Sequence, residues 1–345
     1  MELNMQNQMN DKPEKYEEKR IYTDMCLSLE YVQLYEKKEK GEAKTFHFRS
    51  EYGEIEHSYI KREIPIQLNG KTYYDITSAY GYGGPIIREA NNPEKLFEQY
   101  NAAFAEECSK NQIVSAFYRF HVIESKEATE YFDGKLEFIG PNVVRDLSAP
   151  LDQNMHKSVR TSVRHAKSNG LSAEFHTSDE ALSEFIRIYT ETMKRNDASD
   201  YYYFNSSFFH ELQQKLKGHY VFSQAILEGK VISSFLTLIG SKYGFGFLGG
   251  TSSEYLSYGT STFLEYETMN WLKNNGLQYY IIGGGMKGED NLFRFKKKFD
   301  KEGIYPFYVG KKIYDKNIYD QLLESRRQEV IISPDESFFP LYRTK

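Results

Sequence analysis

The sequence has little cysteine and no long apolar run, and each shortage excludes a class of protein. Its two cysteines, Cys26 and Cys108, lie too far apart for a CxxC zinc or redox motif, and its eight histidines form no HxH or HExxH pattern. We therefore expect no bound metal. The most apolar segment, 231–240, is about half as long as a membrane-spanning helix.

The first residues also lack a targeting signal. Residues 1–20 are polar and aperiodic, without the apolar stretch of a signal peptide, and we expect them to form a flexible lead-in. The sequence therefore predicts a cytoplasmic protein with no integral membrane segment, while peripheral contact with a membrane stays open.

No charge of one sign dominates the chain. Forty-four Lys and Arg against 49 Asp and Glu give the 345 residues a net charge of -5, which excludes a protein that binds nucleic acid over its whole surface. Aromatic residues make up 16%, so a large core is available without disulfides. A chain of this length is expected to form about two domains.

Hydrophobic periodicity is irregular in the first part of the chain and regular in the second. The first part has short strand candidates, an Asn69-Gly70 hairpin signal and a helix over 93–110. In the second part, the predicted helices are 155–169, 180–194, 206–216, 259–274 and 292–299, and the predicted strands are 219–227, 231–239, 243–248, 277–282 and 305–309. This order predicts a mixed α/β sheet with helices on its faces.

A literal GxGxxG motif runs from Gly244 to Gly249, but its surroundings do not suit a dinucleotide site. A dinucleotide fingerprint opens a helix directly after the first strand of a parallel unit. These glycines lie within a strand that follows a hairpin. They favour a strand that a ligand or another backbone approaches closely.

Two further segments combine glycines with aromatic rings. Residues 80–85 (YGYGGP) form either an ordinary loop or a surface that recognises a sugar or a peptide. Residues 283–285 are three glycines after a buried strand, and the segment 292–299 (LFRFKKKF) then places rings inward and cations outward.

A cationic stripe lies on the helix predicted over 155–169. Lys157, Arg160, Arg164 and Lys167 recur at spacings of three and four residues, which places them on one face. Such a stripe is either a solvated face or a surface that holds phosphate groups.

Together these segments resemble the GNAT superfamily of acyltransferases, and within it the FemABX-like enzymes that form peptidoglycan bridges. The match is good over about 150–312 and weak over 1–150. The segments that carry it, in chain order, are Arg164-His165-Ala166-Lys167, Met193-Lys194-Arg195, Tyr201-Tyr202-Tyr203-Phe204, Glu228-Gly229-Lys230, Leu256-Ser257-Tyr258-Gly259, Leu264-Glu265-Tyr266-Glu267, Gly283-Gly284-Gly285 and 292–299.

The resemblance implies two tandem GNAT-like domains. A degenerate acceptor-side domain would comprise 21–150 and 314–345, and a better matched acyl-donor domain would comprise 151–313. It also implies direct transfer of an acyl or aminoacyl group to a primary amine of a cell-envelope precursor, small or lipid-linked, or of an amino sugar. No permanently bound cofactor is implied.

The identity of the donor stays open between two molecules. The GNAT donor-loop pattern Arg/Gln-x-x-Gly-x-Gly/Ala falls on residues 256–261, where Leu256 and Ser261 depart from it. The negative net charge and the missing helical arm lead us to favour acyl-CoA slightly. The basic stripe, and the closeness to bridge-forming enzymes that use aminoacyl-tRNA, favour a tRNA partner. A non-catalytic binding module on a degenerate GNAT scaffold is the alternative of another class.

The resemblance and the motifs together assign roles to individual residues. Catalysis is assigned to Lys296, which corresponds to the lysine of a Phe-Lys-x-x-x-Phe segment, and to Asp290. Candidate general bases are Asp290, Glu289 and Asp75, each of which is alternatively a cap or turn carboxylate. The donor-binding residues are Gly249, Gly250, Ser257, Tyr258, Gly259, Thr260, Arg160 and Arg164, and the acceptor-binding residues are Tyr80, Tyr82, Gly83, Gly84, Arg195 and Tyr202.

Overall fold

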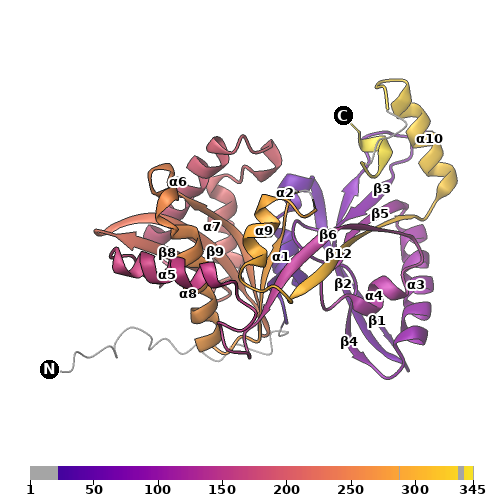
Figure 1. Cartoon of the computed structure of the whole chain (residues 1–345). Helices are drawn as coiled ribbons and strands as arrows, with labels where there is room; N and C mark the ends of the chain where they lie inside the picture. Colours follow the sequence, from indigo (N-terminus) through magenta and orange to yellow (C-terminus); the bar gives the residue numbers. More distant parts are fainter. Residues whose placement is uncertain (1–21, 287, 333–337, 345) are drawn as a thin grey trace.

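One mixed sheet runs through the whole molecule in this computed structural model, which describes residues 22–286, 288–332 and 338–344. The predicted lead-in over 1–20 lies outside the described residues. The sheet has twelve described strands in the order β1-β2-β3-β5-β12-β6-β11-β10-β9-β8-β7, and β4 pairs with β2 beside this path (Figure 1). The predicted mixed α/β fold is confirmed.

The first half of the chain builds one wing of the sheet. Its strands are β1 (Gly41–Ser50), β2 (Gly53–Glu63), β3 (Tyr74–Thr77), β4 (Ile86–Ala90), β5 (Ile113–Arg119) and β6 (Lys135–Asp146). Its helices are α1 (Leu29–Gln33), α2 (Glu36–Glu39), α3 (Pro93–Lys110) and α4 (Lys126–Glu130). The helix predicted over 93–110 has the observed bounds of α3, with Pro93 in its first turn.

The second half builds the other wing, except that its last elements, β12 and α10, pack on strands of the first wing. Its strands are β7 (Ser172–His176), β8 (Tyr220–Leu227), β9 (Lys230–Ile239), β10 (Tyr243–Thr251), β11 (Tyr279–Gly284) and β12 (Ile304–Ile313). Its helices are α5 (Lys157–Ser168), α6 (Asp179–Arg195), α7 (Ser206–Lys215), α8 (Thr260–Asn274), α9 (Asn291–Lys297) and α10 (Lys316–Arg327). Each helix and strand predicted here from periodicity is present, with ends shifted by a few residues.

Where the two wings meet, strands from the two halves of the chain pair with one another. β12, from the end of the chain, pairs antiparallel with β5 and β6 of the first half. β6 in turn pairs with β11 of the second half. The two wings are thus joined by backbone hydrogen bonds rather than by a linker (Figure 1). The predicted domain boundaries at 150 and 313 remain a prediction.

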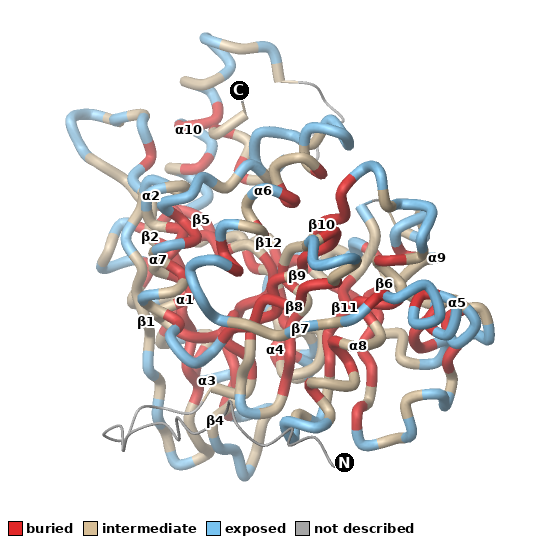
Figure 2. Tube along the Cα trace, turned by 90° about the vertical axis from the view of Figure 1, so that its left-hand side faces the viewer, coloured by how far each residue is buried: buried red, intermediate tan, exposed pale blue. Residues whose placement is uncertain are grey.

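Helices cover both faces of the second wing because the strands bury side chains on both sides. Phe185 of α6 and Phe209 of α7 share a core cluster with Phe222 and Phe245 of the strands. On the opposite face the core is formed by α5, α8 and α9, through residues such as Val159, Phe263 and Phe293. Figure 2 shows the buried residues concentrated in the strands and the exposed ones in outer helices and loops.

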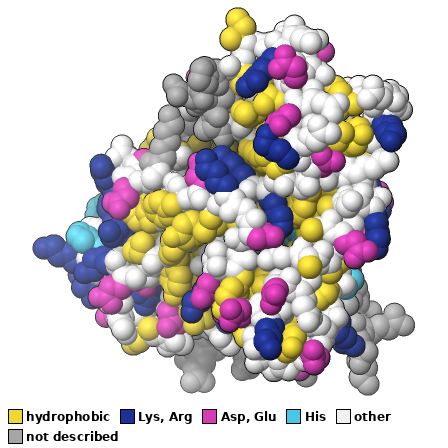
Figure 3. All heavy atoms as spheres, turned by 90° about the vertical axis from the view of Figure 1, so that its right-hand side faces the viewer, with side chains coloured by type: hydrophobic (Ala, Val, Ile, Leu, Met, Phe, Trp, Pro, Cys, Tyr) yellow, Lys and Arg dark blue, Asp and Glu magenta, His cyan; other side chains and the backbone are white. Residues whose placement is uncertain are grey.

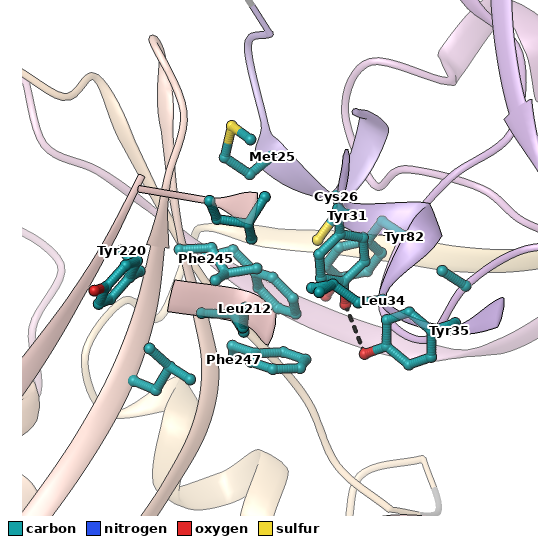
Figure 4. Packing of buried hydrophobic residues seen from close by; sticks show 14 of the residues in the cluster. Met25, Cys26, Tyr31, Leu34, Tyr35, Tyr82, Leu212, Tyr220, Phe245 and Phe247 are labelled. Carbon is teal, nitrogen blue, oxygen red and sulfur yellow. Dashed lines mark hydrogen bonds between the residues drawn. The ribbon is translucent and has the colours of Figure 1, made fainter. Parts of the chain in front are cut away.

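The core continues from one wing into the other. The loop between β3 and β4 brings Tyr82 against Phe245 of β10, with ring centroids 5.1 Å apart. Tyr31 of α1 packs on Phe247 and makes a 3.0 Å hydroxyl contact with Tyr35 (Figure 4). The first half therefore contributes side chains to the surroundings of β10.

Two features of the first half differ from expectation. The Asn69-Gly70 turn closes only an isolated bridge between Leu68 and Lys71, and β3 begins later, at Tyr74. β6 was not predicted, because its sequence contains Gly140 and Pro141 and lacks an alternating pattern. Within the described residues, no helix is long and apolar enough to cross a membrane.

Candidate functional site

The site lies where two parallel strands of the second wing separate. β10 and β11 pair only from Tyr243 opposite Tyr279 to Phe245 opposite Ile281. Beyond this point β11 pairs with β6, and β10 keeps β9 as its strand partner among the described residues. The backbone of the outer part of β10 is therefore available to a ligand that enters between the strands.

Glycines allow close packing along this part of β10. A Cβ on Gly246 would lie 2.7 Å from the Tyr280 hydroxyl oxygen, and one on Gly250 would lie 2.4 Å from Thr192 Oγ1 of α6. A Cβ on Gly249 would lie 2.5 Å from the ring of Phe235. The GxGxxG segment thus lies within a strand, as its context predicted.

Lys296 of α9 extends toward the point of separation. Gly283 at the end of β11 has φ +88°, and a Cβ there would lie 3.1 Å from Lys296 Nζ. The same position is 3.7 Å from both Asn142 Oδ1 and the Tyr82 hydroxyl, which itself donates to Asn142 Oδ1 at 2.9 Å. The ammonium thus lies beside Gly283 of β11, and polar groups of β6 and of the β3–β4 loop border the same position.

Glu265 of α8 is the acidic partner of this lysine. Its side chain is 7% exposed, and its Oε1 has no hydrogen-bond partner among the described residues. Burial raises the pKa of Glu265 to about 7, against the smaller opposing effects of a hydrogen bond from Tyr280 and of the Lys296 charge. Burial also lowers the pKa of Lys296 to about 8, although Glu265 and Asp290 oppose the shift. The pair therefore titrates close to neutral pH.

Asp290 holds the loop in front of α9. Its Oδ1 accepts from the backbone N–H of Phe293 at 2.9 Å, and its Oδ2 accepts from that of Met286 at 2.7 Å. Asp290 is thus the N-cap of α9, close enough to raise the pKa of Lys296. Both carboxylate oxygens accept from the backbone, which favours a positioning role over proton transfer.

The other two candidate bases lie in different surroundings. Glu289 is exposed next to Asp290. Asp75 is completely buried in the first wing, where it accepts from Arg62 Nε at 2.8 Å and also from Arg343. Two guanidinium groups hold this carboxylate within the first wing, so the structure does not bring Asp75 together with Lys296.

The predicted donor loop connects β10 to α8. Ser253–Tyr258 form a short 3-10 helix, and Gly259 has φ +69° immediately before α8 begins at Thr260. No side chain of the described residues caps this N-terminus, and Tyr258 is 40% exposed. Ser257, Tyr258, Gly259 and Thr260 thus surround an uncapped helix end, which is suited to an anionic group.

Arg195 lies at the donor loop, although the sequence assigned it to the acceptor side. Its Nη1 donates to the carbonyl of Thr251 at 2.9 Å and to Ser253 Oγ at 3.0 Å. Glu191, one turn earlier on α6, accepts from the backbone N–H of Ser253 at 2.7 Å. The end of α6 therefore holds the start of this loop in place.

α5 passes beside the same loop. A Cβ on Gly259 would lie 3.8 Å from the Cβ of Ser162. Arg160 and Arg164 are exposed on the outer side of the helix, and Arg160 lies 3.5 Å from Asp152. The two arginines therefore border the donor loop and do not line the strand separation.

On the acceptor side, the structure brings Tyr80 and Tyr202 together with ring centroids 5.9 Å apart. Arg119, which the sequence analysis missed, lies 5.7 Å from the centre of the Tyr80 ring and donates to the Gly81 carbonyl at 3.0 Å. Tyr80 and Arg119 come from the first half of the chain, and Tyr202 comes from the second.

Gly83 and Gly84, the two glycines assigned to the acceptor, pack against the end of β5 and the residue that follows it. Gly83 donates its N–H to the carbonyl of Arg119 at 2.6 Å, and a Cβ on Gly84 would lie 3.0 Å from the ring of Phe120. They fix the loop that carries Tyr80 and Tyr82. Tyr82 itself is 5% exposed, so its hydroxyl contributes to the site only through Asn142 and the surroundings of Lys296.

This geometry can be compared with known proteins. The family model described as an acetyltransferase (GNAT) domain matches residues 153–297. These residues form a GNAT domain. The match contains α5, the donor loop, the β10–β11 separation and Lys296. In the first half, β3 and β5 form a parallel pair next to antiparallel strands, as β10 and β11 do in the second.

Solved structures share the fold of nearly the whole chain. FemX aligns with a TM-score of 0.67 at 13% identity, over 86% of this chain and 94% of that one. The C-terminal domain of a putative lysylphosphatidylglycerol synthetase from Agrobacterium fabrum gives 0.54 at 15%, over 90% and 94%. L-PGS from Bacillus licheniformis gives 0.51 at 13%, over 84% and 93%. Among curated protein sequences, no significant match is found.

The sequence analysis did not single out Glu265 or Tyr280 as site residues. A signal for Glu265 was present: it lies in the buried stripe of α8 with Thr268, Met269 and Leu272, where a charge is costly without a partner. For Tyr280 and Asn142 there was no comparable signal, because their roles depend on pairing between distant strands.

Proposed function

We propose that this GNAT-family chain transfers an aminoacyl group from aminoacyl-tRNA to a primary amine of a cell-envelope precursor. The observation that carries the proposal is the Lys296 ammonium, held beside Glu265 at the strand separation with its pKa lowered to about 8. At neutral pH such a group is mostly protonated and yet gives up its proton readily.

The leaving group decides which donor this lysine suits. A thioester releases a thiolate, whose conjugate acid has a pKa of roughly 8.5, so it leaves as an anion without help. An aminoacyl ester of ribose releases an alkoxide, which is a strong base like hydroxide (water has a pKa of about 15.7) and must take a proton as it leaves. A general acid at this position therefore favours an oxygen ester.

Protons balance over the reaction as follows. The neutral amine attacks the ester carbonyl, and backbone N–H groups of the outer part of β10 stabilise the oxyanion. The carbon–oxygen bond to ribose breaks as Lys296 gives its proton to the ribose oxygen. The neutral lysine then takes the extra proton from the new amide nitrogen, which restores the ammonium.

The structural relatives support the same donor. FemX belongs by name to the enzymes that the sequence resembles, and those enzymes use aminoacyl-tRNA. The name lysylphosphatidylglycerol synthetase implies that this relative attaches a lysyl group to a lipid. The slight preference for acyl-CoA rested on net charge and a missing arm, and these relatives favour the alternative over it.

The acceptor is proposed to lie against the aromatic surface between the wings. Tyr80 and Tyr202 offer ring faces, and Arg119 offers a cation beside them. Such a surface suits a sugar or peptide part of an envelope precursor, with its amine directed toward Lys296.

The test compares donors and pH profiles with the full chain. We expect transfer from aminoacyl-tRNA and none from acetyl-CoA across a panel of amines. Lys296→Ala should lower kcat/KM by about 10²- to 10⁴-fold. The control is Lys110→Ala, which removes an exposed ammonium of α3 that pairs with Glu106 at 2.7 Å, and it should behave as wild type.

The pH profile separates an acid role from a structural one. The wild-type rate should fall above about pH 8 as Lys296 loses its proton. Glu265→Gln removes a charge that raises the pKa of Lys296, so the fall should begin at lower pH. Turnover of acetyl-CoA alone, or a Lys296→Ala variant with full activity, would contradict the proposal. Ligand binding without any turnover would favour the binding module.

A further inference from the structure

The cations of α5 and α9 form one surface, which we call the basic arc. It consists of four residues on α5 and three at the end of α9: Lys157, Arg160, Arg164, Lys167, Arg294, Lys297 and Lys298. The two helices abut, because the backbone N–H of His156 donates to the carbonyl of Lys298 at 2.8 Å. The arc therefore begins within two residues of Lys296.

Few carboxylates balance this surface. Lys167 pairs with Glu267 at 2.8 Å, and the exposed Arg160 lies 3.5 Å from Asp152. Lys157, Arg164 and Lys298 have no carboxylate within 4.0 Å among the described residues, and the first turns of α5 and α9 contain no acidic residue. The chain as a whole has a net charge of -5, so this excess of positive charge is local. Its cations repel one another unless an anion binds among them.

The rest of the surface is organised differently. On the face of the first half in Figure 3, Lys and Arg side chains are interspersed with Asp and Glu. On α3 Lys110 pairs with Glu106, and on α10 Arg327 pairs with Glu324. The unbalanced arc is thus a local feature that borders the donor loop.

The side chains of α5 indicate which kind of anion fits. Its exposed face offers cations together with Thr161 and His165, and no large hydrophobic residue of α5 is exposed. A helix that lies on a membrane presents exposed apolar side chains, so α5, which forms most of the arc, does not suit a lipid surface. From Lys157 to Lys167 the cations extend about 15 Å along the axis, which suits a row of phosphates rather than one phosphate.

We propose that the basic arc binds the phosphate backbone of a double-helical RNA stem, the acceptor stem of the donor tRNA. This rests on the proposed function, because an aminoacyl ester at Lys296 places the adjoining stem outside the donor loop. A stem on α5 lies beside Gly259 and leads its 3′ end past the uncapped start of α8. The arc reads the shape and charge of the stem, not its sequence.

The test uses two triple variants with the same change in charge. The first, Lys157→Gln with Arg160→Gln and Arg164→Gln, neutralises the arc. The control, Lys110→Gln with Lys316→Gln and Arg327→Gln, removes three exposed cations of α3 and α10, which lie on the first wing. Circular dichroism establishes that both variants are folded.

The first readout is binding of an uncharged RNA hairpin that carries a tRNA acceptor stem, measured between 50 and 200 mM salt. The arc variant should lose about tenfold in affinity. Its slope of log K against log salt should fall by about 3, one unit for each lost phosphate contact. The control variant should bind as wild type. An unchanged slope, or an equal loss in the control, overturns the proposal, as does arc-dependent binding of phosphatidylglycerol vesicles without RNA binding.

The second readout compares two donors. The donors are full aminoacyl-tRNA and a 3′-aminoacyl dinucleotide, which has no stem. In the arc variant kcat/KM should fall for the tRNA and not for the dinucleotide, so the ratio of the two should fall. An unchanged ratio overturns the arc while leaving the proposed function intact. Turnover of acetyl-CoA and of neither aminoacyl donor contradicts both together.

Discussion

The two wings of the sheet each contain a parallel strand pair, and they treat buried charge in opposite ways. In the first wing, the carboxylate of Asp75 accepts from Arg62, Arg343 and the Tyr342 hydroxyl. In the second, Glu265 keeps one oxygen without a hydrogen-bond partner among the described residues. A fully satisfied buried charge stabilises a fold, whereas an unsatisfied one with a shifted pKa marks a place where protons move.

The parallel strand pairs of the two wings also differ in how far they stay together. In the first wing, the pairing of β3 with β5 is extended by a bridge between Gly83 and Phe120. In the second wing, β10 and β11 separate after Phe245. The first wing has thus closed the opening that the second wing keeps, and side chains of its β3–β4 loop project toward that opening.

The largest effect is expected for Asp75→Ala, which tests whether the buried charge of the first wing serves stability alone. It leaves Arg62 and Arg343 without their shared carboxylate, so the free energy of unfolding should fall by about 3–5 kcal/mol in urea titrations. The variant should be less stable, yet its folded fraction should keep the wild-type pH profile of transfer. A loss below about 1 kcal/mol would mean that this cluster is not the structural counterpart of the Glu265–Lys296 pair.

The second wing should be sensitive to added volume at its opening. Gly250→Ala places a Cβ 2.4 Å from Thr192 Oγ1 and 3.0 Å from the carbonyl oxygen of Ile188, so α6 must shift. Overpacking of this kind costs about 1–3 kcal/mol, which thermal unfolding would measure. Thr192→Ala in the same chain should recover part of the loss, and an unaltered melting temperature for Gly250→Ala would contradict the packing.

The sequence predicted the regular parts of the molecule better than the site. Helices such as α3 and α6 follow from side-chain periodicity, and Pro93 suits the first turn of α3; both are local signals. The exchange of β6 and β12 is a pairing between distant segments, and no local pattern encodes it. Lys296 was found through resemblance, and Tyr80 and Tyr202, assigned together, do meet.

Glu265→Gln tests the buried charge of the second wing through the pH dependence of stability. The raised pKa of Glu265, about 7, means that its contribution to stability is present below its ordinary value of 4.5 and is lost as pH rises through about 7. The glutamine variant lacks this loss, so its stability relative to wild type should rise between pH 5 and 8, by on the order of 1–2 kcal/mol. Urea midpoints at four pH values measure it, and parallel curves would contradict it.

The smallest expected effect tests the contact between the wings. Tyr82→Phe removes the hydroxyl that donates to Asn142 Oδ1 at 2.9 Å. A buried hydrogen bond of this kind contributes about 1 kcal/mol, so the melting temperature should fall slightly. The alkaline limb of the rate should also move, because Asn142 is then free to reorient beside Lys296. A rate profile identical to wild type would place Tyr82 outside the reacting region.

The pairing of β6 and β12 with strands of both halves limits how far the chain can be truncated. A fragment that begins after residue 150 lacks β6, so β11 loses a neighbour and β12 loses both of its strand partners. Exposed edges of this kind pair with other chains, so the fragment should aggregate rather than act as a smaller enzyme. The first half thus cannot be deleted, because it supplies the strands with which β11 and β12 pair.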